Sequence, residues 1–471
     1  MEVFWHRRDL RIPDNVGLAA AAREGEVVPV FVVREDVLDR LGERQRAFVA
    51  DGVRALDRAY RDRGSGLLVR VGEPARQLAA VRQEYGADAI RYNRHYRPAR
   101  RNAERRVDRR LPTKPETDHV LVAPDRLDAE YPTHSQFYDD WTAEPKPAPV
   151  PPPDEDALVE PDGDGVAGLD GGSTDRSGDA DIPRPAVDVD LPRPGYGAAR
   201  DRYDAFLADG IDSYADTRDD VAAAVERPVG PVSRLSPYLA AGMIGTREVW
   251  ADATERYRAA DGETRRNVEK YRYELSWRER NYHLLAHNPG LLTHNYRDFP
   301  NEIVWRNDRE EFEAWKRGET GYPFVDAGMA QLDAEGYVHN RPRQVVASFL
   351  TKHLLVDWRK GARYFADRLV DHDPATNYGN WQWIASTGTD PVDVRVFDPV
   401  AQLAKYDEDA EYVRAYLPEL GDVPPEKIVD WPTLDDAERE ALAPEYAHPV
   451  VDRDAAYERA VRVFEEALGK R

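Results

Sequence analysis

The chain has 471 residues, a formal net charge of −22 and no cysteine. This length suffices for two or three domains with a large core. The lack of cysteine excludes a disulfide framework, a thiolate nucleophile and a cysteine zinc site. No segment reaches the apolar length of a membrane span, and residues 1–8 read as a strand and a basic cluster rather than a signal peptide. We therefore expect a cytoplasmic protein without a membrane partner.

The charge itself is informative. Acidic residues are spread along the whole chain, arginine is abundant and lysine is scarce. Such an acidic excess is a halophilic device for solubility, and we predict a halophilic protein. A negative net charge usually argues against nucleic-acid binding, because phosphate contacts need cations, but it says little about one local site.

Short apolar segments alternate with helical patterns over residues 2–122. Strands are expected at 2–6, 27–33, 67–71, 89–93 and 118–122, and helices near 14–23, 43–63, 74–85 and 99–110. This alternation predicts a doubly wound parallel sheet of five strands, which binds ligands at the carboxyl ends of its strands. Polar residues follow the first and fourth strands there: Arg7, Arg8, Arg11, Asn93, Arg94 and His95. The sequence leaves two interpretations of these residues open: a small-molecule site, or a rim of the sheet with solvated charges.

Residues 144–195 change in character, because a proline-rich run leads into an Asp/Gly-rich run. This composition predicts a linker or a partly disordered segment. Gly163, Gly165 and Gly168 match the dinucleotide-binding pattern G-x-G-x-x-G. No strand precedes the match and no apolar helix follows it, so we interpret it as a chance match.

From Tyr196 onward the pattern is helical. Ser233 and Ser236 lie where a helix is expected to begin, which suits either simple capping or a phosphate contact. In the predicted helix 271–283, one face carries Tyr271, Glu274, Arg278 and Asn281, and Trp277 adjoins it. That face either carries a surface ion pair between Glu274 and Arg278 or forms the wall of a pocket.

Three further features complete the pattern. His283 and His287 have the spacing of a zinc helix, but the glutamate of H-E-x-x-H is missing, so no metal is expected. Asn340 as N-cap and Pro342 in the first turn predict a helix start. Residues 371–388 combine two acids, two carboxamides and a Trp-x-Trp pair, which is either ordinary core or the wall of an aromatic ligand site.

Taken together, these segments resemble the DNA photolyase/cryptochrome family, specifically the class I cyclobutane pyrimidine dimer photolyases of haloarchaea. The resemblance rests on residues 4–11, 233–236, 271–278 and 371–388 with Trp305 and Trp358, and it spans nearly the whole chain apart from the linker. It implies an α/β antenna domain at 1–143, a linker at 144–195, and an all-α domain at 196–471 that binds FAD and DNA.

The resemblance also implies site residues. The FAD would be held by Tyr214, Val232, Ser233, Arg234, Leu235, Ser236, Tyr271, Arg278, Arg343, Asp371, His372, Asp373 and Asn377. Within this set, Arg343 would pair with Asp371, and Asn377 would lie at flavin N5. Trp305, Trp358 and Trp381 match the chain that carries electrons to the flavin. Glu274 would contact the lesion and stabilise its radical anion, and the lesion pocket would further comprise Trp277, Asn340, Arg341, Gln344 and Trp383.

Several residues depart from the family pattern. Gln344 and the run 377–380 resemble the DASH cryptochromes, while Arg280, Asn281, Val232 and residues 392–394 replace residues usual in cyclobutane-dimer photolyases. Ala99 and Arg100 stand where a folate-binding Asn-Glu pair would lie. For the second chromophore, a deazaflavin or none at all therefore fits better than a folate.

The leading hypothesis is a carbon–carbon lyase: a monomeric deoxyribodipyrimidine photo-lyase that repairs damaged DNA by electron transfer from light-excited, reduced FAD. A cryptochrome-like blue-light photoreceptor and a DASH-like photolyase restricted to single-stranded DNA are the alternatives. The tryptophan chain serves all of them and does not discriminate.

Overall fold

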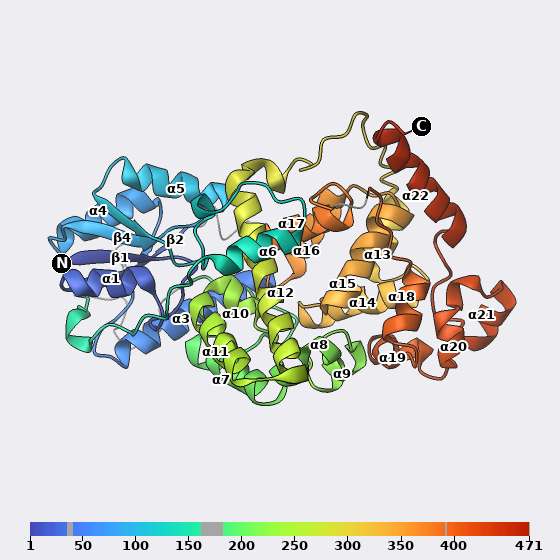
Figure 1. Ribbon diagram of the computed structural model, residues 1–471, viewed down its shortest axis with the longest axis horizontal. Helices are drawn as coiled ribbons and strands as arrows, with labels where there is room; N and C mark the ends of the chain where they lie inside the picture. Colours follow the sequence, from blue (N-terminus) through green and yellow to red (C-terminus); the bar gives the residue numbers. More distant parts are fainter. Residues whose placement is uncertain (35–40, 162–181, 391–392, 471) are drawn as a thin grey trace.

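The computed structural model describes residues 1–34, 41–161, 182–390 and 393–470. An N-terminal α/β domain leads into a larger helical part, which ends in the long C-terminal helix at the far end of the molecule (Figure 1). The G-x-G-x-x-G match at 163–168 lies outside the described residues.

The sheet is parallel and has five strands in the order β3-β2-β1-β4-β5. Its strands are β1 (Glu2–His6), β2 (Val27–Val33), β3 (Leu68–Val71), β4 (Ala89–Asn93) and β5 (Thr113–Glu116). The central strand β1 is buried on both faces, as expected of a sheet that helices cover on both sides. The predicted doubly wound sheet is confirmed.

The position of the fifth strand was predicted wrongly. Strand β5 pairs with β4 at Thr113–Glu116, whereas residues 118–122 form a buried loop. Their apolar side chains are covered by the helical part of the molecule. The backbone N–H of Leu121 donates to Glu279 Oε2 over 2.8 Å, in place of a sheet partner. The apolar run therefore marks an interface between domains, which has the same composition as a buried strand.

The helices of the N-terminal part are α1 (Val16–Glu24), α3 (Glu43–Arg61), α4 (Pro74–Glu84), α5 (Pro98–Asp108) and α6 (His134–Ala143). The described ends of the segment between the two parts run along the α/β domain. Leu158 forms a bridge with Val27 of β2, and both Leu158 and Ile182 are buried. These contacts hold both described ends against the sheet domain.

The helical part is built around the long helix α12 (Gly262–His287), which packs against α6, α8, α11 and α17. The other helices are α7 (Tyr196–Asp209), α8 (Tyr214–Thr217), α9 (Val221–Glu226), α10 (Ser236–Ala241), α11 (Thr246–Ala259), α13 (Arg309–Arg317), α14 (Pro323–Glu335), α15 (Asn340–Ser348), α16 (Trp358–Arg368), α17 (Pro374–Ile384), α18 (Pro399–Tyr406), α19 (Glu411–Tyr416), α20 (Pro425–Val429), α21 (Asp436–Leu442) and α22 (Arg453–Ala467).

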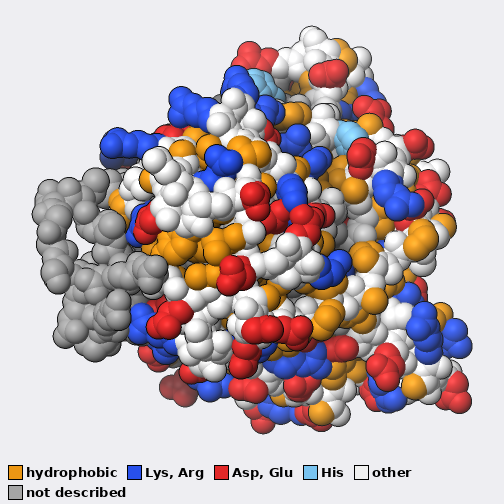
Figure 2. Space-filling view, turned by 90° about the vertical axis from the view of Figure 1, so that its left-hand side faces the viewer, with side chains coloured by type: hydrophobic (Ala, Val, Ile, Leu, Met, Phe, Trp, Pro, Cys, Tyr) orange, Lys and Arg blue, Asp and Glu red, His pale blue; other side chains and the backbone are white. Residues whose placement is uncertain are grey.

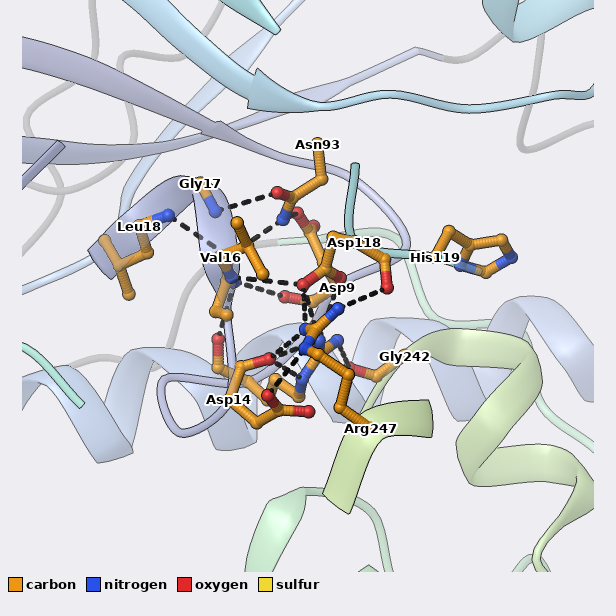
Figure 3. A network of polar contacts seen from close by, with 12 residues as sticks. Asp9, Asp14, Val16, Gly17, Leu18, Asn93, Asp118, His119, Gly242 and Arg247 are labelled. Carbon is orange, nitrogen blue, oxygen red and sulfur yellow. Dashed lines mark hydrogen bonds and ion pairs between the residues drawn. The ribbon is translucent and has the colours of Figure 1, made fainter. Parts of the chain in front are cut away.

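A buried ionic network joins the two parts (Figure 3). Arg247 of α11 is 1% exposed; its Nε lies 2.9 Å from Asp14 Oδ1, and it also pairs with Asp118. Arg11 reaches Asp118 from the loop after β1, over 2.8 Å. Burial alone would raise the pKa of Asp118, but the two guanidinium groups hold it below its usual range. Removing one partner of such a network leaves a buried charge uncompensated.

The outer surface is mixed in charge. On the face formed by the α/β end of the molecule, acidic and basic side chains are interspersed among neutral and apolar groups, without one continuous basic stripe on the visible, described part (Figure 2). The chain as a whole has a net charge of −22. A surface of this kind favours solubility over general attraction to a phosphate backbone.

Candidate functional site

A cavity of about 410 Å³ lies among α10, α12, α15 and α17. Its size is within the range of small-molecule and cofactor sites. Most residues that the sequence singled out line it: Ser233, Leu235, Ser236, Tyr271, Glu274, Trp277, Arg278, Asn340, Arg343, Gln344, Asp371, His372, Asp373, Asn377, Trp381 and Trp383. Segments far apart in the chain thus converge on one space.

The stretch before α17 forms the acidic floor of this cavity. Asp373 caps α17 by accepting the backbone N–H of Thr376 over 3.2 Å, and it also pairs with Arg8 over 2.8 Å. The hydroxyl of Tyr282 donates to the same carboxylate. Burial alone would raise the pKa of Asp373, but Arg8, Arg278 and the Tyr282 hydroxyl hold it well below its usual range. Asp373 is therefore ionised throughout the physiological pH range.

Asp371 and His372, which precede Asp373 in the chain, each carry one buried polar atom without a hydrogen-bond partner among the described residues. Arg343 Nη2 lies 3.3 Å from Asp371 Oδ2, so the expected ion pair is present. The two atoms without a partner are Asp371 Oδ1 and His372 Nδ1. Burial lowers the pKa of His372 to about 3, so its ring is neutral near pH 7. Orphaned buried polar atoms that line a cavity are expected to meet a ligand.

Asn377 projects from α17 with a fixed amide. Its Nδ2 donates to the carbonyl oxygen of Ala362 over 2.9 Å, and a carbonyl can only accept, which sets which end of the amide is which. Gly379, one half-turn on, lies directly against the side chain of Asn281 on α12, where a Cβ would collide. This close approach of α17 to α12 shapes the wall of the cavity.

Glu274 is held by two cations at the cavity. Lys270 Nζ lies 2.7 Å from Glu274 Oε1, and Arg218 pairs with the same oxygen. Arg218 also lines the cavity but was missed by the sequence analysis. It lies far from Glu274 in the chain, on the short segment after α8, and no spacing rule connects the two positions.

Two aromatic side chains face each other beside Glu274. The ring centres of Trp277 and Trp383 are 6.5 Å apart, with an angle of 59° between the planes. The Arg395 guanidinium lies 5.1 Å from the Trp383 ring centre. Gln344 Oε1 accepts from Arg341, and Arg341 also pairs with Asp219 over 2.7 Å. Arg341 lies next to the cavity without lining it.

The helix starts expected at Ser236 and Asn340 are confirmed, but the assignment of Asn340 as the N-cap is wrong. Asn340 is the first residue of α15, and the capping residue is His339, whose Nδ1 accepts the N–H of Arg341. Ser236 is likewise the first residue of α10, where Leu235 holds the cap position without a side-chain hydrogen bond. Histidine is not among the preferred caps, so the sequence favoured the neighbouring asparagine.

Three residues expected to hold a cofactor do not line the cavity: Tyr214, Val232 and Arg234. Arg234, with a φ of 46°, pairs with Glu335 over 2.6 Å and lies over the Tyr337 ring. Its guanidinium is therefore engaged outside the cavity. Tyr214 supports the wall from behind, because its ring lies edge-on to Tyr271 at 5.2 Å.

The three tryptophans of the expected electron chain lie on neighbouring elements. Trp381 lines the cavity and is 3% exposed, and Gly361 of the adjoining α16 leaves room for its ring. Trp358 begins α16; it is fully buried and donates its Nε1–H to Asn295 over 2.9 Å. Trp305 is partly exposed and lies outside the cavity, edge-on to Phe464 at 5.9 Å.

The two histidines with zinc spacing have other partners. The Nε2 atoms of His283 and His287 lie 2.9 and 3.0 Å from the carbonyl oxygens of Val122 and Pro124. A carbonyl accepts only, so both nitrogens carry hydrogen and donate. Within the described residues, no cluster of histidine and carboxylate side chains has the arrangement of a metal site.

A second cavity lies at the carboxyl edge of the sheet. Its described lining carries the arginines Arg7, Arg8, Arg97 and Arg100, and it shares Ala240 and His372 with the large cavity. The two cavities therefore meet at one common wall. Burial and the neighbouring arginines lower the pKa of Arg100 well below its usual value. Arg7 and Arg8 pair with Glu104 and Asp373, and Arg97 and Arg100 are half-buried; a lining of this kind would suit an anionic ligand.

Two family models match two separate parts of the chain. Residues 2–154 match the model for DNA photolyase, and residues 271–466 match the FAD binding domain of DNA photolyase. A protein of Halobacterium salinarum named deoxyribodipyrimidine photo-lyase is 40% identical, with both chains covered completely. The chain belongs to the DNA photolyase family.

Two further relatives place the photolyase fold in context. A class III photolyase structure from Agrobacterium tumefaciens has a TM-score of 0.85 and 34% identity, covering 100% of this chain and 98% of that one. A Natronomonas pharaonis protein named cryptochrome DASH is 34% identical over 97% of this chain and 99% of its own. None of the helices described here is long and apolar enough to cross a membrane.

Proposed function

We propose that this photolyase-family protein repairs UV-induced cyclobutane pyrimidine dimers in DNA, driven by light and by electron transfer from reduced FAD. The observation that carries the proposal is the cavity of about 410 Å³ among α10, α12, α15 and α17. Its lining includes the polar and acidic residues Asp371, Asp373 and Asn377, and also Glu274 with the two tryptophans Trp277 and Trp383. A cofactor and a damaged dinucleotide would therefore occupy adjoining parts of one space.

The cavity residues fit FAD. The volume of the cavity suits a cofactor. Asp371 Oδ1 and His372 Nδ1 have no hydrogen-bond partner in the part of the chain that the structure describes, and a ribose or a flavin edge can supply one. Ser233, Leu235 and Ser236 line the same space, where their hydroxyl and backbone groups suit phosphate oxygens. Tyr271, Arg278 and Arg343 complete the lining on the side of α12 and α15. Asn377, whose amide is fixed by Ala362, would lie toward flavin N5.

Reduced FAD, when bound and illuminated, supplies the electron that opens the dimer. The tryptophans serve a separate task, which is to restore the reduced cofactor. Trp381 lines the cavity, Trp358 is buried on the adjoining helix, and Trp305 is partly exposed. This order from cavity to surface suits electron delivery from an external donor.

The lesion end is built for stacking and hydrogen bonding. A damaged dinucleotide costs less to extrude from a duplex, because its pairing is already weakened. Trp277 and Trp383 provide flat surfaces, worth about 1–3 kcal/mol per stacked base. Glu274 would accept from a base edge, and its two cation partners, Lys270 and Arg218, fix the orientation of its carboxylate. Asn340, Arg341 and Gln344 border this end of the site.

Further parts of the proposal concern the whole chain. The division into an antenna domain at 1–143, a linker at 144–195 and a helical domain at 196–471 remains our assignment, as do a monomeric state and the lack of a metal. The second cavity is the place for an accessory chromophore, and its arginines suit anionic groups. A deazaflavin or no accessory chromophore stays the prediction, and the absorption spectrum of the purified protein checks it.

The test is illumination of purified, reduced protein with oligonucleotides that carry one dimer, in single- and double-stranded form. We expect dimers to disappear from both substrates under blue light and from neither in the dark. Loss from the single strand alone would favour the DASH-like alternative. No loss from either substrate, with flavin bound, would contradict repair and leave a photoreceptor as the remaining function.

A further inference from the structure

A histidine lies flat against the lesion-side tryptophan. The rings of His134 and Trp277 are parallel within 7°, with centres 3.7 Å apart. His134 is the first residue of α6, and Trp277 lies in the middle of α12, against which α6 packs (Figure 1). A parallel stack at this distance is direct van der Waals contact between the imidazole and one face of the indole.

The orientation of the His134 ring is fixed by one hydrogen-bond chain. His134 Nε2 lies 2.9 Å from Ser276 Oγ, and Ser276 Oγ donates to the carbonyl oxygen of Tyr273 over 2.6 Å. A hydroxyl has a single hydrogen, so Ser276 Oγ accepts from His134 Nε2–H. The imidazole therefore carries its hydrogen on Nε2, and this bond sets the plane of the ring.

The stack is a contact between two neutral rings. Burial lowers the pKa of His134 to about 3, and His134 is 5% exposed. Arg280 also contacts the indole: its guanidinium lies 5.4 Å from the Trp277 ring centre and donates to the carbonyl oxygen of Tyr131, just before α6. Trp277 lines the cavity, whereas neither His134 nor Arg280 does. Both therefore support the indole from the protein side.

We propose that His134 is a positioning residue that holds the Trp277 indole in the plane needed to stack on the damaged base. The inference rests on the proposed function, because it requires Trp277 to meet a base. An indole that is already ordered in the free protein loses little conformational freedom on binding. The α/β part of the chain thus shapes the lesion pocket through one side chain of α6.

The experiment compares two substitutions that differ in one property. His134→Leu and His134→Phe both remove the hydrogen bond to Ser276 and both keep an apolar side chain of similar bulk, but only phenylalanine keeps a flat ring. The measurements are the Kd for a dimer-containing duplex in the dark, and KM and kcat of repair under light. His283→Leu is the matched control. Like His134, His283 is a buried histidine of lowered pKa, but it lies on α12 and contacts Val122 rather than Trp277.

We expect His134→Leu to raise Kd and KM about 3- to 10-fold, in line with the loss of one aromatic pair, with the effect on KM rather than on kcat. His134→Phe restores Kd to within about twofold of the wild type, and His283→Leu lowers the melting temperature without changing Kd. In a Trp277→Ala background, His134→Leu adds no further loss, because the two residues act as one unit.

Equal Kd values for wild type and His134→Leu would overturn the inference. So would a His134→Phe variant that binds as weakly as His134→Leu, or a full additional loss in the Trp277→Ala background. Failure of the proposed function gives a different result. The wild type then binds the dimer but does not repair it in light, and the Kd values of the variants measured in the dark still test the role of His134.

Discussion

Trp381 is the residue at which the proposed electron path meets the cofactor cavity. It lines the cavity and is nearly buried, and its ring contacts Phe365 at 5.2 Å and Trp315 at 6.3 Å. Phenylalanine fits the same space next to Gly361 but is far harder to oxidise. The role of Trp381 is therefore separable from its contribution to the structure.

We expect Trp381→Phe to block photoreduction of oxidised FAD and to leave repair by chemically reduced protein largely intact. The absorption spectrum of the flavin under blue light, with an external thiol donor, checks the first part. Dimer loss with dithionite-reduced protein checks the second. Tyr378→Phe serves as a control. Tyr378 is a residue of α17 whose ring lies beside that of Trp358, but it is not part of the proposed electron path. An equal loss of both activities in Trp381→Phe would argue against a relay.

At the scale of elements, the contact between α12 and α17 decides the shape of the cavity. Gly379 on α17 lies so close to the Asn281 side chain that a Cβ would collide with it. Both helices contribute lining residues on either side of this point, including Tyr271, Trp277 and Asn377. A small spreading of the helices would therefore widen the cofactor site.

We expect Gly379→Ala to lower the free energy of unfolding by about 1–3 kcal/mol, through overpacking at this contact. It should also speed the release of flavin, because the wall of the cavity moves. Thermal unfolding followed by flavin fluorescence measures both effects. The double variant Gly379→Ala with Asn281→Ala regains most of the stability if the collision is the cause, and a Gly379→Ala protein of wild-type stability would rule the contact out as critical.

Elements also show what sequence patterns could and could not predict. Four strands and residues 271–283 of α12 were predicted from their periodicity, which reflects burial on known faces, whereas the start of this helix at Gly262 was not. The fifth strand was not predicted at its true position. Its residues, Thr113–Glu116, are polar and lie at the sheet edge, whereas the apolar run at 118–122 has the composition of a buried strand but is buried against the helical part. The cap at His339 and the Arg218–Glu274 pair depend on side-chain placement between distant segments, which no local pattern records.

At the scale of the whole molecule, burial has left many histidines neutral. The pKa is lowered for His95, His119, His134, His283, His339, His353 and His372, in each case chiefly by burial. In the unfolded chain these groups return to a pKa of about 6.5. Between these values the unfolded state binds more protons than the folded state, so stability rises with pH.

The contribution of these histidines is therefore complete above about pH 6.5 and is lost as the pH falls below it, at up to about 1.4 kcal/mol per pH unit and histidine. We expect the midpoint of urea unfolding to fall steeply from pH 7 to pH 5 at constant salt. A flat profile across this interval would contradict the neutral, buried state of these side chains. His134→Phe, which removes one titrating group, should reduce the slope.

The distribution of charge also bears on DNA binding. Around the cavity, Lys270 and Arg218 are paired with Glu274, and Arg341 is paired with Asp219. These cations are partly neutralised within the protein, and the chain as a whole has a net charge of −22. Few counterions are then released when DNA binds, and recognition depends on stacking and pocket shape.

We expect a shallow salt dependence of dimer binding, with the slope of log K against log salt concentration smaller in magnitude than about 3. Titrations of a dimer-containing duplex between low and molar salt provide the slope, with an undamaged duplex for comparison. A slope of about 6 to 10 would indicate many phosphate contacts and refute this account. Stability in dilute buffer equal to that in molar salt would count against a halophilic protein.

The central claim is that one cavity brings reduced FAD and a pyrimidine dimer together. The most direct measurement mixes reduced, flavin-loaded protein with an equal amount of double-stranded oligonucleotide containing one dimer, and then counts dimers after single blue flashes and in the dark. We expect each flash to convert a fraction of the bound dimers to intact pyrimidines, and none to be converted in the dark. Bound dimers that survive repeated flashes would contradict this claim.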